Sequence, residues 1–216
     1  MKHSAILSIV ATLHLFGCAS FPETLSARRA EPGDALDLNP EEILIFGRIL
    51  FTENGKNKIP YGLSKPLWQI TTLESEQVPG EPVEKRRIIP FLSTGKDGAF
   101  RYVIPAGRYA VTHVVPLYYT PMIDPAVGFE AGEPGHAYYL GDLEVDFASW
   151  SWLGGLWGNY ITRIKHLEVV DRFDEVRDLF LRDFPSSYLA KKALLVPIKG
   201  RLPGLKEQYV PPIIHK

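Results

Sequence analysis

Side chains suited to acid–base or metal chemistry are scattered along this sequence rather than gathered in a motif. Beyond the N-terminal segment the histidines are His113, His136, His166 and His215, and none has another histidine two or four positions away. Zinc sites on one helix or strand use such pairs, so we predict neither a metal site nor another cofactor. The sequence also lacks a Gly-x-Ser-x-Gly elbow, and we assign no catalytic residue. A hydrolytic site that joins His113, His136 and Asp124 in space is the alternative.

Composition excludes several classes of protein. The 216 residues carry 24 basic and 25 acidic side chains, and this balance argues against a nucleic-acid-binding protein. Hydrophobic residues make up 45% of the chain, enough for one folded domain with attachments and too many for a disordered protein. The single cysteine, Cys18, excludes an intrachain disulfide and a cluster of thiolate ligands. The basic run at residues 85–87 predicts a charged face that protects a sheet edge rather than a phosphate site.

Cys18 lies at the end of an N-terminal segment whose pattern is typical of a signal peptide. A charged start precedes a mostly apolar run at residues 5–16, which is shorter than the roughly 20 residues that span a bilayer. The run leads into Leu-Phe-Gly-Cys at residues 15–18, which resembles the lipobox of bacterial lipoproteins. The resemblance implies cleavage after Gly17 and attachment of a diacylglyceryl thioether and a fatty acyl chain, such as palmitate, to Cys18. The alternative is a buried N-terminal helix in which the cysteine only packs.

The same resemblance implies a location and a division of the chain. Ala19 rather than Asp follows Cys18, and the sorting rules of bacterial lipoproteins then imply the outer membrane, on its periplasmic side or at the cell surface. Residues 1–17 form the expected signal peptide. Residues 18–40 are the expected lipidated cysteine and flexible tether, since they lack apolar periodicity. Residues 41–216 are the expected folded domain.

From residue 41 onward the pattern predicts short β-strands separated by turns. Gly47, inside the first apolar run, indicates a bulge or a close approach of two backbones. Asp97-Gly98 predicts a hairpin, because glycine supplies the positive φ that such a turn needs. The predicted strands are residues 43–52, 67–73, 88–92, 100–104, 109–115, 127–129 and 137–147. Such a series is typical of an antiparallel β-sandwich.

Four segments of this region share a pattern. They are Asp97-Gly98-Ala99-Phe100, Pro105-Ala106-Gly107-Arg108-Tyr109, Phe129 and Tyr138-Tyr139-Leu140-Gly141. Together they resemble the transthyretin-like sandwiches, which include the carboxypeptidase regulatory-like domains. The resemblance implies a mainly β fold, an antiparallel seven-stranded Greek-key sandwich that serves as an accessory or binding module. It implies no catalytic residue, because the carboxypeptidases of this group carry their zinc in a separate domain.

The C-terminal third departs from a bare sandwich. Residues 160–170 predict a further strand. Residues 172–183 predict an amphipathic helix with Asp171 as its N-cap. A second helical turn is predicted at residues 187–195. We expect the first helix to pack on one sheet as a lid within the same domain.

Large aromatic residues gather between two of the predicted strands. They are Trp150, Trp152, Trp157 and Tyr160, interrupted by glycines. One interpretation is a loop that inserts at a membrane interface or grips a ligand. The interpretation that we favour is that Trp150 and Trp152 pack under the C-terminal helix, since a small sandwich needs large residues to fill that space.

The sequence therefore predicts a lipid-anchored protein of the cell envelope that acts as a non-enzymatic binding module. Its expected partners are the membrane, through the N-terminal lipid, and another envelope protein, but not nucleic acid. Two alternatives stay open: an envelope hydrolase with an unrecognised histidine and aspartate site, and a sugar or lipid binder that uses the aromatic loop.

Overall fold

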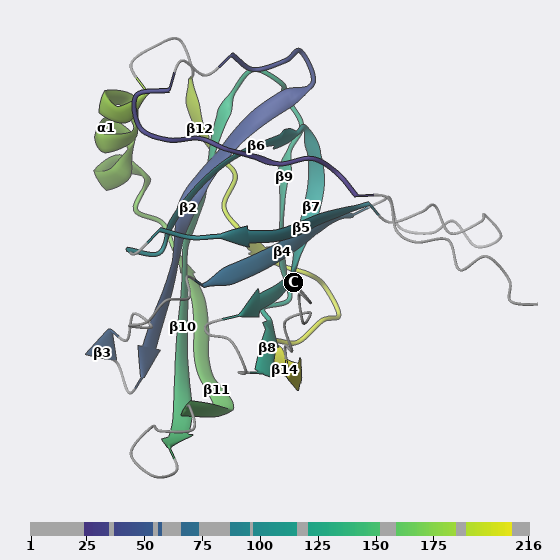
Figure 1. The fold of residues 1–216 in the computed structure, drawn as a ribbon, viewed down its shortest axis with the longest axis vertical. Helices are drawn as coiled ribbons and strands as arrows, with labels where there is room; N and C mark the ends of the chain where they lie inside the picture. Colours follow the sequence, from purple (N-terminus) through teal and green to yellow (C-terminus); the bar gives the residue numbers. More distant parts are fainter. Residues whose placement is uncertain are drawn as a thin grey trace, which may run out of the picture.

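The chain folds as two β-sheets packed face to face, with the helix α1 (Phe173–Asp183) against the outer face of one sheet (Figure 1). The computed structural model describes residues 24–34, 37–53, 56–57, 66–73, 87–95, 97–115, 121–151, 159–184 and 189–208. No helix in these ranges has the length and hydropathy needed to cross a bilayer. The prediction of a mainly β protein with a C-terminal helix is confirmed.

The first sheet, called here the helix-bearing sheet, has the order β1-β6-β2-β10-β11, with β3 beside β2 and β12 beside β10. Its strands are β1 (Arg28–Arg29), β2 (Glu42–Glu53), β3 (Lys56–Asn57), β6 (Ala99–Pro105), β10 (Ala137–Ser151), β11 (Asn159–Val170) and β12 (Ala190–Lys192). β10 runs parallel to both β2 and β12. The expected purely antiparallel order is wrong here, because β2 and β10 are joined through the opposite sheet and not by a hairpin.

The second sheet, called here the open sheet, has the order β13-β9-β7-β4-β5, with β8 pairing with β7 and β14. Its strands are β4 (Leu67–Thr72), β5 (Ile88–Ser93), β7 (Gly107–Val115), β8 (Pro121–Asp124), β9 (Val127–Ala131), β13 (Val196–Pro197) and β14 (Gly204–Gln208). All of its pairs are antiparallel.

β2 is buried on both faces, which explains its unbroken apolar sequence. Alternate side chains of a strand point to opposite faces. Ile43 and Ile45 belong to the core between the sheets, whereas Leu44 and Phe46 belong to a second cluster under α1. Phe180 of α1 stacks on Phe46 with a centroid distance of 4.1 Å. The expected packing of the helix on one sheet is thus confirmed.

The link between β5 and β6 crosses from one sheet to the other, so the hairpin predicted at Asp97-Gly98 is wrong. β5 pairs with β4, whereas β6 pairs with β1 and β2. Gly98 does have a positive φ of 80°, and its carbonyl accepts a hydrogen bond from the Ile49 N–H at 2.9 Å. The local turn chemistry is as expected, but it does not specify which sheet receives the next strand.

Part of the expected tether is docked on the sandwich. Thr24 forms a parallel bridge with Ile88 of β5, and the Leu25 N–H donates to the Ile88 carbonyl at 2.9 Å. The segment then crosses to the helix-bearing sheet, where β1 pairs with β6. Ala30 is buried in the cluster under α1. Residues 24–34 are therefore part of the fold, and Leu25 and Ala27 pack against the core between the sheets.

The region expected to form a second helical turn, residues 187–195, contains the strand β12 instead. β12 pairs with Ala137–Tyr139, the start of β10. β11 ends opposite Asp142 and does not reach those residues. The free edge of β10 recruits the strand, and a weak local helical pattern is overridden by tertiary pairing.

Candidate functional site

The structure describes only part of the predicted aromatic site. Cys18, Gly17, Trp152 and Trp157 lie outside the described residues. Trp150 and Tyr160 are register partners near the turn of the β10–β11 hairpin. Tyr139, which packs under α1, is eleven residues from Trp150, or about 36 Å along the strand. The backbone of Trp150 therefore lies far along β10 from the residues under α1, and the packing of the four aromatic side chains stays a prediction.

The candidate acid–base residues contact different neighbours among the described residues. The contacts are His113 Nδ1 to Gln69 Oε1 at 2.8 Å, His136 Nδ1 to the Pro134 carbonyl at 2.9 Å, His166 Nε2 to Glu168 Oε2 at 3.1 Å, and Asp124 Oδ2 to Arg201 Nη2 at 2.6 Å. None of these contacts joins two of the candidates to each other, and His215 lies outside the described residues. Within the described ranges no group of three or more His, Cys, Asp or Glu side chains could hold a metal ion.

The strongest polar cluster is centred on Asp142 of β10, a residue that the sequence analysis missed. A register shift between Tyr139 and Asp142 interrupts the pairing with β2, and Gly141 at this point has a φ of 92°. Leu140 within the shift and Leu143 after it both face the core between the sheets. Asp142 therefore points toward α1, on the same side as Tyr139. A glycine followed by an acidic residue within an apolar strand was the signal that could have indicated this bulge.

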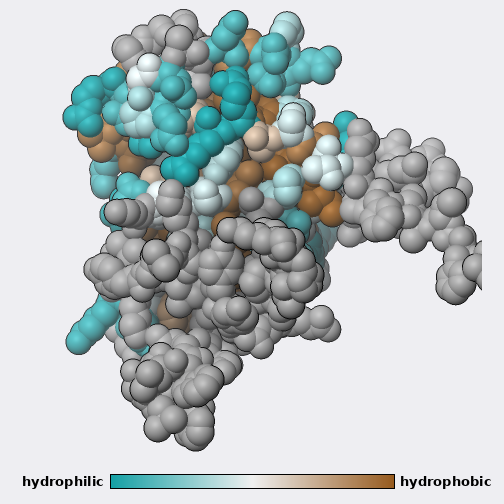
Figure 2. All heavy atoms as spheres, in the orientation of Figure 1, coloured by the Kyte–Doolittle hydropathy of each residue, from teal (hydrophilic) through white to brown (hydrophobic). Residues whose placement is uncertain are grey.

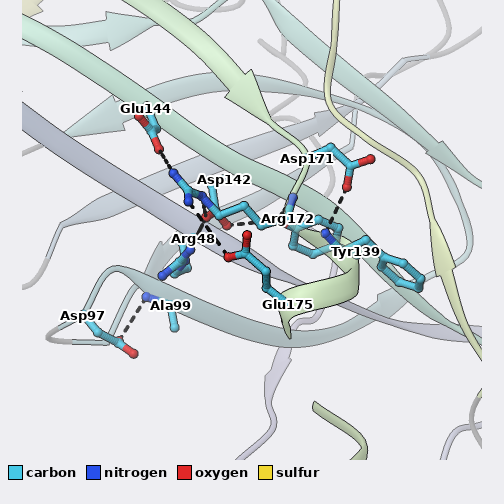
Figure 3. A network of polar contacts seen from close by, with 10 residues as sticks. Arg48, Asp97, Ala99, Tyr139, Asp142, Glu144, Asp171, Arg172 and Glu175 are labelled. Carbon is cyan, nitrogen blue, oxygen red and sulfur yellow. Dashed lines mark hydrogen bonds and ion pairs between the residues drawn. The ribbon is translucent and has the colours of Figure 1, made fainter. Parts of the chain in front are cut away.

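Two guanidinium groups meet the carboxylate of Asp142, which is 0% exposed (Figure 3). Arg48 of β2 donates from Nε to Oδ2 at 2.9 Å and makes a second bond from Nη2 to the same oxygen. Nε of Arg172 lies 3.3 Å from Oδ2, an ion-pair contact without the angle of a hydrogen bond. The buried negative charge is thus compensated from both sides, as it must be away from water.

Tyr139 satisfies the other oxygen of Asp142. Its hydroxyl donates to Oδ1 at 3.1 Å and accepts the backbone N–H of Arg172 at 3.2 Å. Burial raises the pKa of the Tyr139 hydroxyl, and the hydrogen bond to Asp142 raises the pKa of Arg48. Both groups therefore stay in their donor forms at neutral pH.

Arg172 connects the cluster to the helix. Its Nη2 donates to Glu144 Oε1 at 3.1 Å, and its Nη1 lies 3.9 Å from Glu175 Oε2 in the first turn of α1. Arg172 is also the N-cap residue, one position later than the predicted Asp171. The Asp171 carboxylate nevertheless accepts the Phe173 N–H at 2.9 Å, which satisfies a free donor of the first turn.

The pKa of Asp171 is lowered by the hydrogen bond from Lys192, whose Nζ lies 2.8 Å from Oδ2. Lys192 belongs to β12, so this pair links that strand to the start of α1. Asp171 therefore accepts a hydrogen bond at the N-terminus of α1 and also connects α1 to β12.

A small cavity lies beside the Asp142 cluster. It has a volume of about 140 Å³ and reaches the surface near Leu179 of α1, which is 52% exposed. Its walls are mainly apolar, with Arg48 among the polar residues. The lining residues are Phe46, Gly47, Arg48, Asp97, Ala99, Phe100, Arg101, Tyr139, Asp142, Val176, Leu179 and Phe180.

This arrangement suits binding better than proton transfer. A general base needs an accessible lone pair near its substrate, and the Asp142 oxygens are occupied by Arg48, Arg172 and Tyr139. The cavity has the size of one apolar side chain and a cation at its wall. It can accept an apolar group.

Comparison of the chain with protein-family models, with curated proteins and with solved structures found no match.

Proposed function

We propose that this protein is a lipid-anchored component of the cell envelope, held at the outer membrane through Cys18, that binds a partner protein and is not an enzyme. The observation that carries the proposal is the Leu-Phe-Gly-Cys sequence at residues 15–18, directly after a short apolar run with a charged start. Three acyl chains on one cysteine exceed the two anchoring signals that stable membrane attachment needs.

The fold is consistent with a transthyretin-like Greek-key module, which we include in the proposal. The order of the main strands, β6-β2-β10-β11 in one sheet and β5-β4-β7-β9 in the other, supports it. The chain passes repeatedly from one sheet to the other, as at the links from β5 to β6 and from β6 to β7. Such crossings characterise Greek-key sandwiches.

The binding role is supported by the Asp142 cluster, whose polar groups are already paired with one another. The Asp142 carboxylate is used to position α1, and the cavity next to it opens beside an exposed leucine. The anchor of a protein interface is commonly a side chain that fills a pocket of its partner, and this cavity has the size to receive one.

Replacing the proposed lipidation residue tests the anchor. Cys18→Ser removes the thiol that would attack the lipid donor, so we expect the variant to leave the membrane fraction and to take up no labelled fatty acid. Ser20→Ala is the matched control, and it should fractionate and label like the natural chain. Absence of labelled fatty acid from the natural chain would contradict the proposed anchor.

Charge at the mouth of the cavity tests the binding role. Leu179→Arg places a cation where we expect a partner's apolar side chain, so in-cell crosslinking should lose its main product. Leu202→Arg is the matched control, because Leu202 is 88% exposed and does not line the cavity. Both variants should keep the stability of the natural chain, as surface changes usually do. An unchanged crosslinking pattern with Leu179→Arg would exclude this surface.

A further inference from the structure

The segment at residues 24–34, called here the docked segment, ends against the C-terminal end of α1. Figure 1 shows it as a dark purple trace that passes from the ends of β4 and β5 to the helix. The Gly33 N–H donates to the Asp183 carbonyl at 2.9 Å, and this satisfies a carbonyl that the last turn of a helix leaves free. A segment far from α1 in the sequence is thus bonded to the last residue of that helix.

The docked segment also forms part of the apolar layer under α1. Ala30 is 1% exposed and belongs to the same cluster as Phe180 and Phe184 at the end of the helix. The rings of these two phenylalanines lie at a centroid distance of 5.1 Å. Removal of the segment would expose part of this cluster to water, so the burial of the helix end depends on docking.

Arg101 of β6 contacts both elements. Its carbonyl accepts the Ala30 N–H at 3.1 Å, and its Nη2 donates to Asp183 Oδ2 at 3.1 Å. Its guanidinium also lies 5.9 Å from the centre of the Phe184 ring, which is a cation–π contact. One residue of the sheet therefore holds the docked segment through its backbone and the end of the helix through its side chain.

α1 depends on such contacts because it is short. Isolated helices of fewer than about 12 residues are marginal in water, and α1 has 11. Its first turn is held by Arg172 and the Asp142 cluster, whereas its last turn is held by the docked segment and Arg101. Loss of the docked segment therefore loosens the C-terminal half of the helix and leaves the first turn in place.

The C-terminal half of α1 forms part of the wall of the cavity of about 140 Å³. Leu179 and Phe180 line it together with Phe46 and Arg101 of the sheet. In Figure 2, the region over α1 at the upper left is mainly hydrophilic, with hydrophobic residues between the hydrophilic ones. When this half of the helix loosens, the apolar residues under it become accessible and the cavity widens.

We propose that the docked segment regulates this cavity. While the segment is docked, the cavity keeps the size of one apolar side chain. Release of the segment loosens the end of α1, and the cavity opens into a groove that accepts a longer apolar stretch of a partner protein. This regulation rests on the proposed partner-binding role of the cavity. By linkage, a partner that prefers the open groove also promotes release of the segment.

Amide hydrogen exchange tests the coupling in the full chain with Cys18→Ser, without lipid or partner. Gly33 has a φ of 87° and nothing lies within 4 Å of a Cβ there, so Gly33→Ala strains the docked conformation without a clash. A positive φ costs alanine about 1 kcal/mol, so the amides of residues 180–184 should exchange about 5-fold faster. Gly200→Ala is the matched control, since Gly200 has a φ of 77° and equally open surroundings but lies between β13 and β14.

The control should leave the exchange of the α1 amides unchanged. Unchanged exchange in Gly33→Ala, or an equal rise in both variants, would overturn the proposal, because α1 would then open independently of the docked segment.

The coupling should also act in the reverse direction. Asp183→Ala removes the carboxylate bound to Arg101 but keeps the carbonyl that accepts the Gly33 N–H, so it reaches the docked segment only through α1. The Ala30 amide should then exchange several-fold faster, whereas Asp178→Ala, an exposed change on the same helix, should leave it unchanged. Equal exchange of the Ala30 amide in the two variants would contradict the coupling.

The exchange experiments contain no partner and no lipid, so they report on the coupling alone. Crosslinking of the Leu179→Arg variant reports on partner binding alone. A failure of the regulation is therefore distinguishable from a failure of the proposed binding role.

Discussion

Asp142→Asn should lower the free energy of unfolding by about 3 kcal/mol. The substitution keeps the size of the side chain but leaves the guanidinium groups of Arg48 and Arg172 without their shared anion. Arg48 and Arg172 are 34% and 37% exposed, so water compensates part of the loss and the cost falls at the lower end of the range for broken buried pairs. The contact between α1 and β10 is weakened at the same time.

Urea unfolding followed by tryptophan fluorescence measures this effect. Asp178→Asn is the matched control, since Asp178 is exposed on α1 beside Arg177, and its change should stay within about 0.5 kcal/mol. Arg48→Met should cost less than Asp142→Asn, because Arg172 still compensates the carboxylate. If Asp142→Asn were as stable as Asp178→Asn, the cluster would not be what holds the helix.

Gly47→Ala should destabilise the fold by about 3 kcal/mol, because β2 and β10 are too close for a side chain at this position. A Cβ on Gly47 would lie 2.5 Å from the Gly141 carbonyl oxygen and 2.8 Å from the ring of Phe100. The first of these is backbone in the centre of the sheet and cannot move aside alone. The close approach predicted for Gly47 is thus confirmed, and it coincides with the bulge that turns Asp142 toward α1.

Gly132→Ala provides the comparison for the same chemical change. Nothing lies within 4 Å of a Cβ at Gly132, so the free energy of unfolding of this variant should stay within about 0.5 kcal/mol of that of the natural chain. Guanidinium unfolding curves of the two variants give the difference directly. Equal midpoints for Gly47→Ala and Gly132→Ala would contradict the prediction, because they would show that β2 and β10 can move apart without a loss of stability.

The strands that carry the core could be predicted because their pattern reflects burial. β2 is apolar at successive positions since both of its faces are covered, and β7 follows the predicted residues 109–115 closely. The helix could be predicted because Phe173, Val176 and Phe180 fall on one face, and all three belong to the cluster that packs on the sheet.

The short strands and the polar cluster could not be predicted, because tertiary context decides them. β1 and β12 exist only because β6 and β10 offer them an edge, and a run of two or three residues has no period of its own. The orientation of Asp142 could not be predicted, because a one-residue shift at Gly141 reverses the face of the sheet on which each later side chain lies. Its two arginines are far apart in the sequence: the pairing of β2 with β10 places Arg48 beside Asp142, and the pairing of β11 with β10 places Arg172 there.

The docking of residues 24–30 has a mechanical consequence. Tension on the N-terminus reaches the Leu25 and Ala30 backbone hydrogen bonds and the two-residue pairing of β1 before it reaches β2. These few contacts are the weakest that such tension meets, and they can break one after another. Releasing the chain as far as Pro40 would extend the reach from Cys18 from about 20 Å to about 75 Å. The sandwich would then remain folded while the distance over which it can be pulled from the proposed attachment point at Cys18 more than triples.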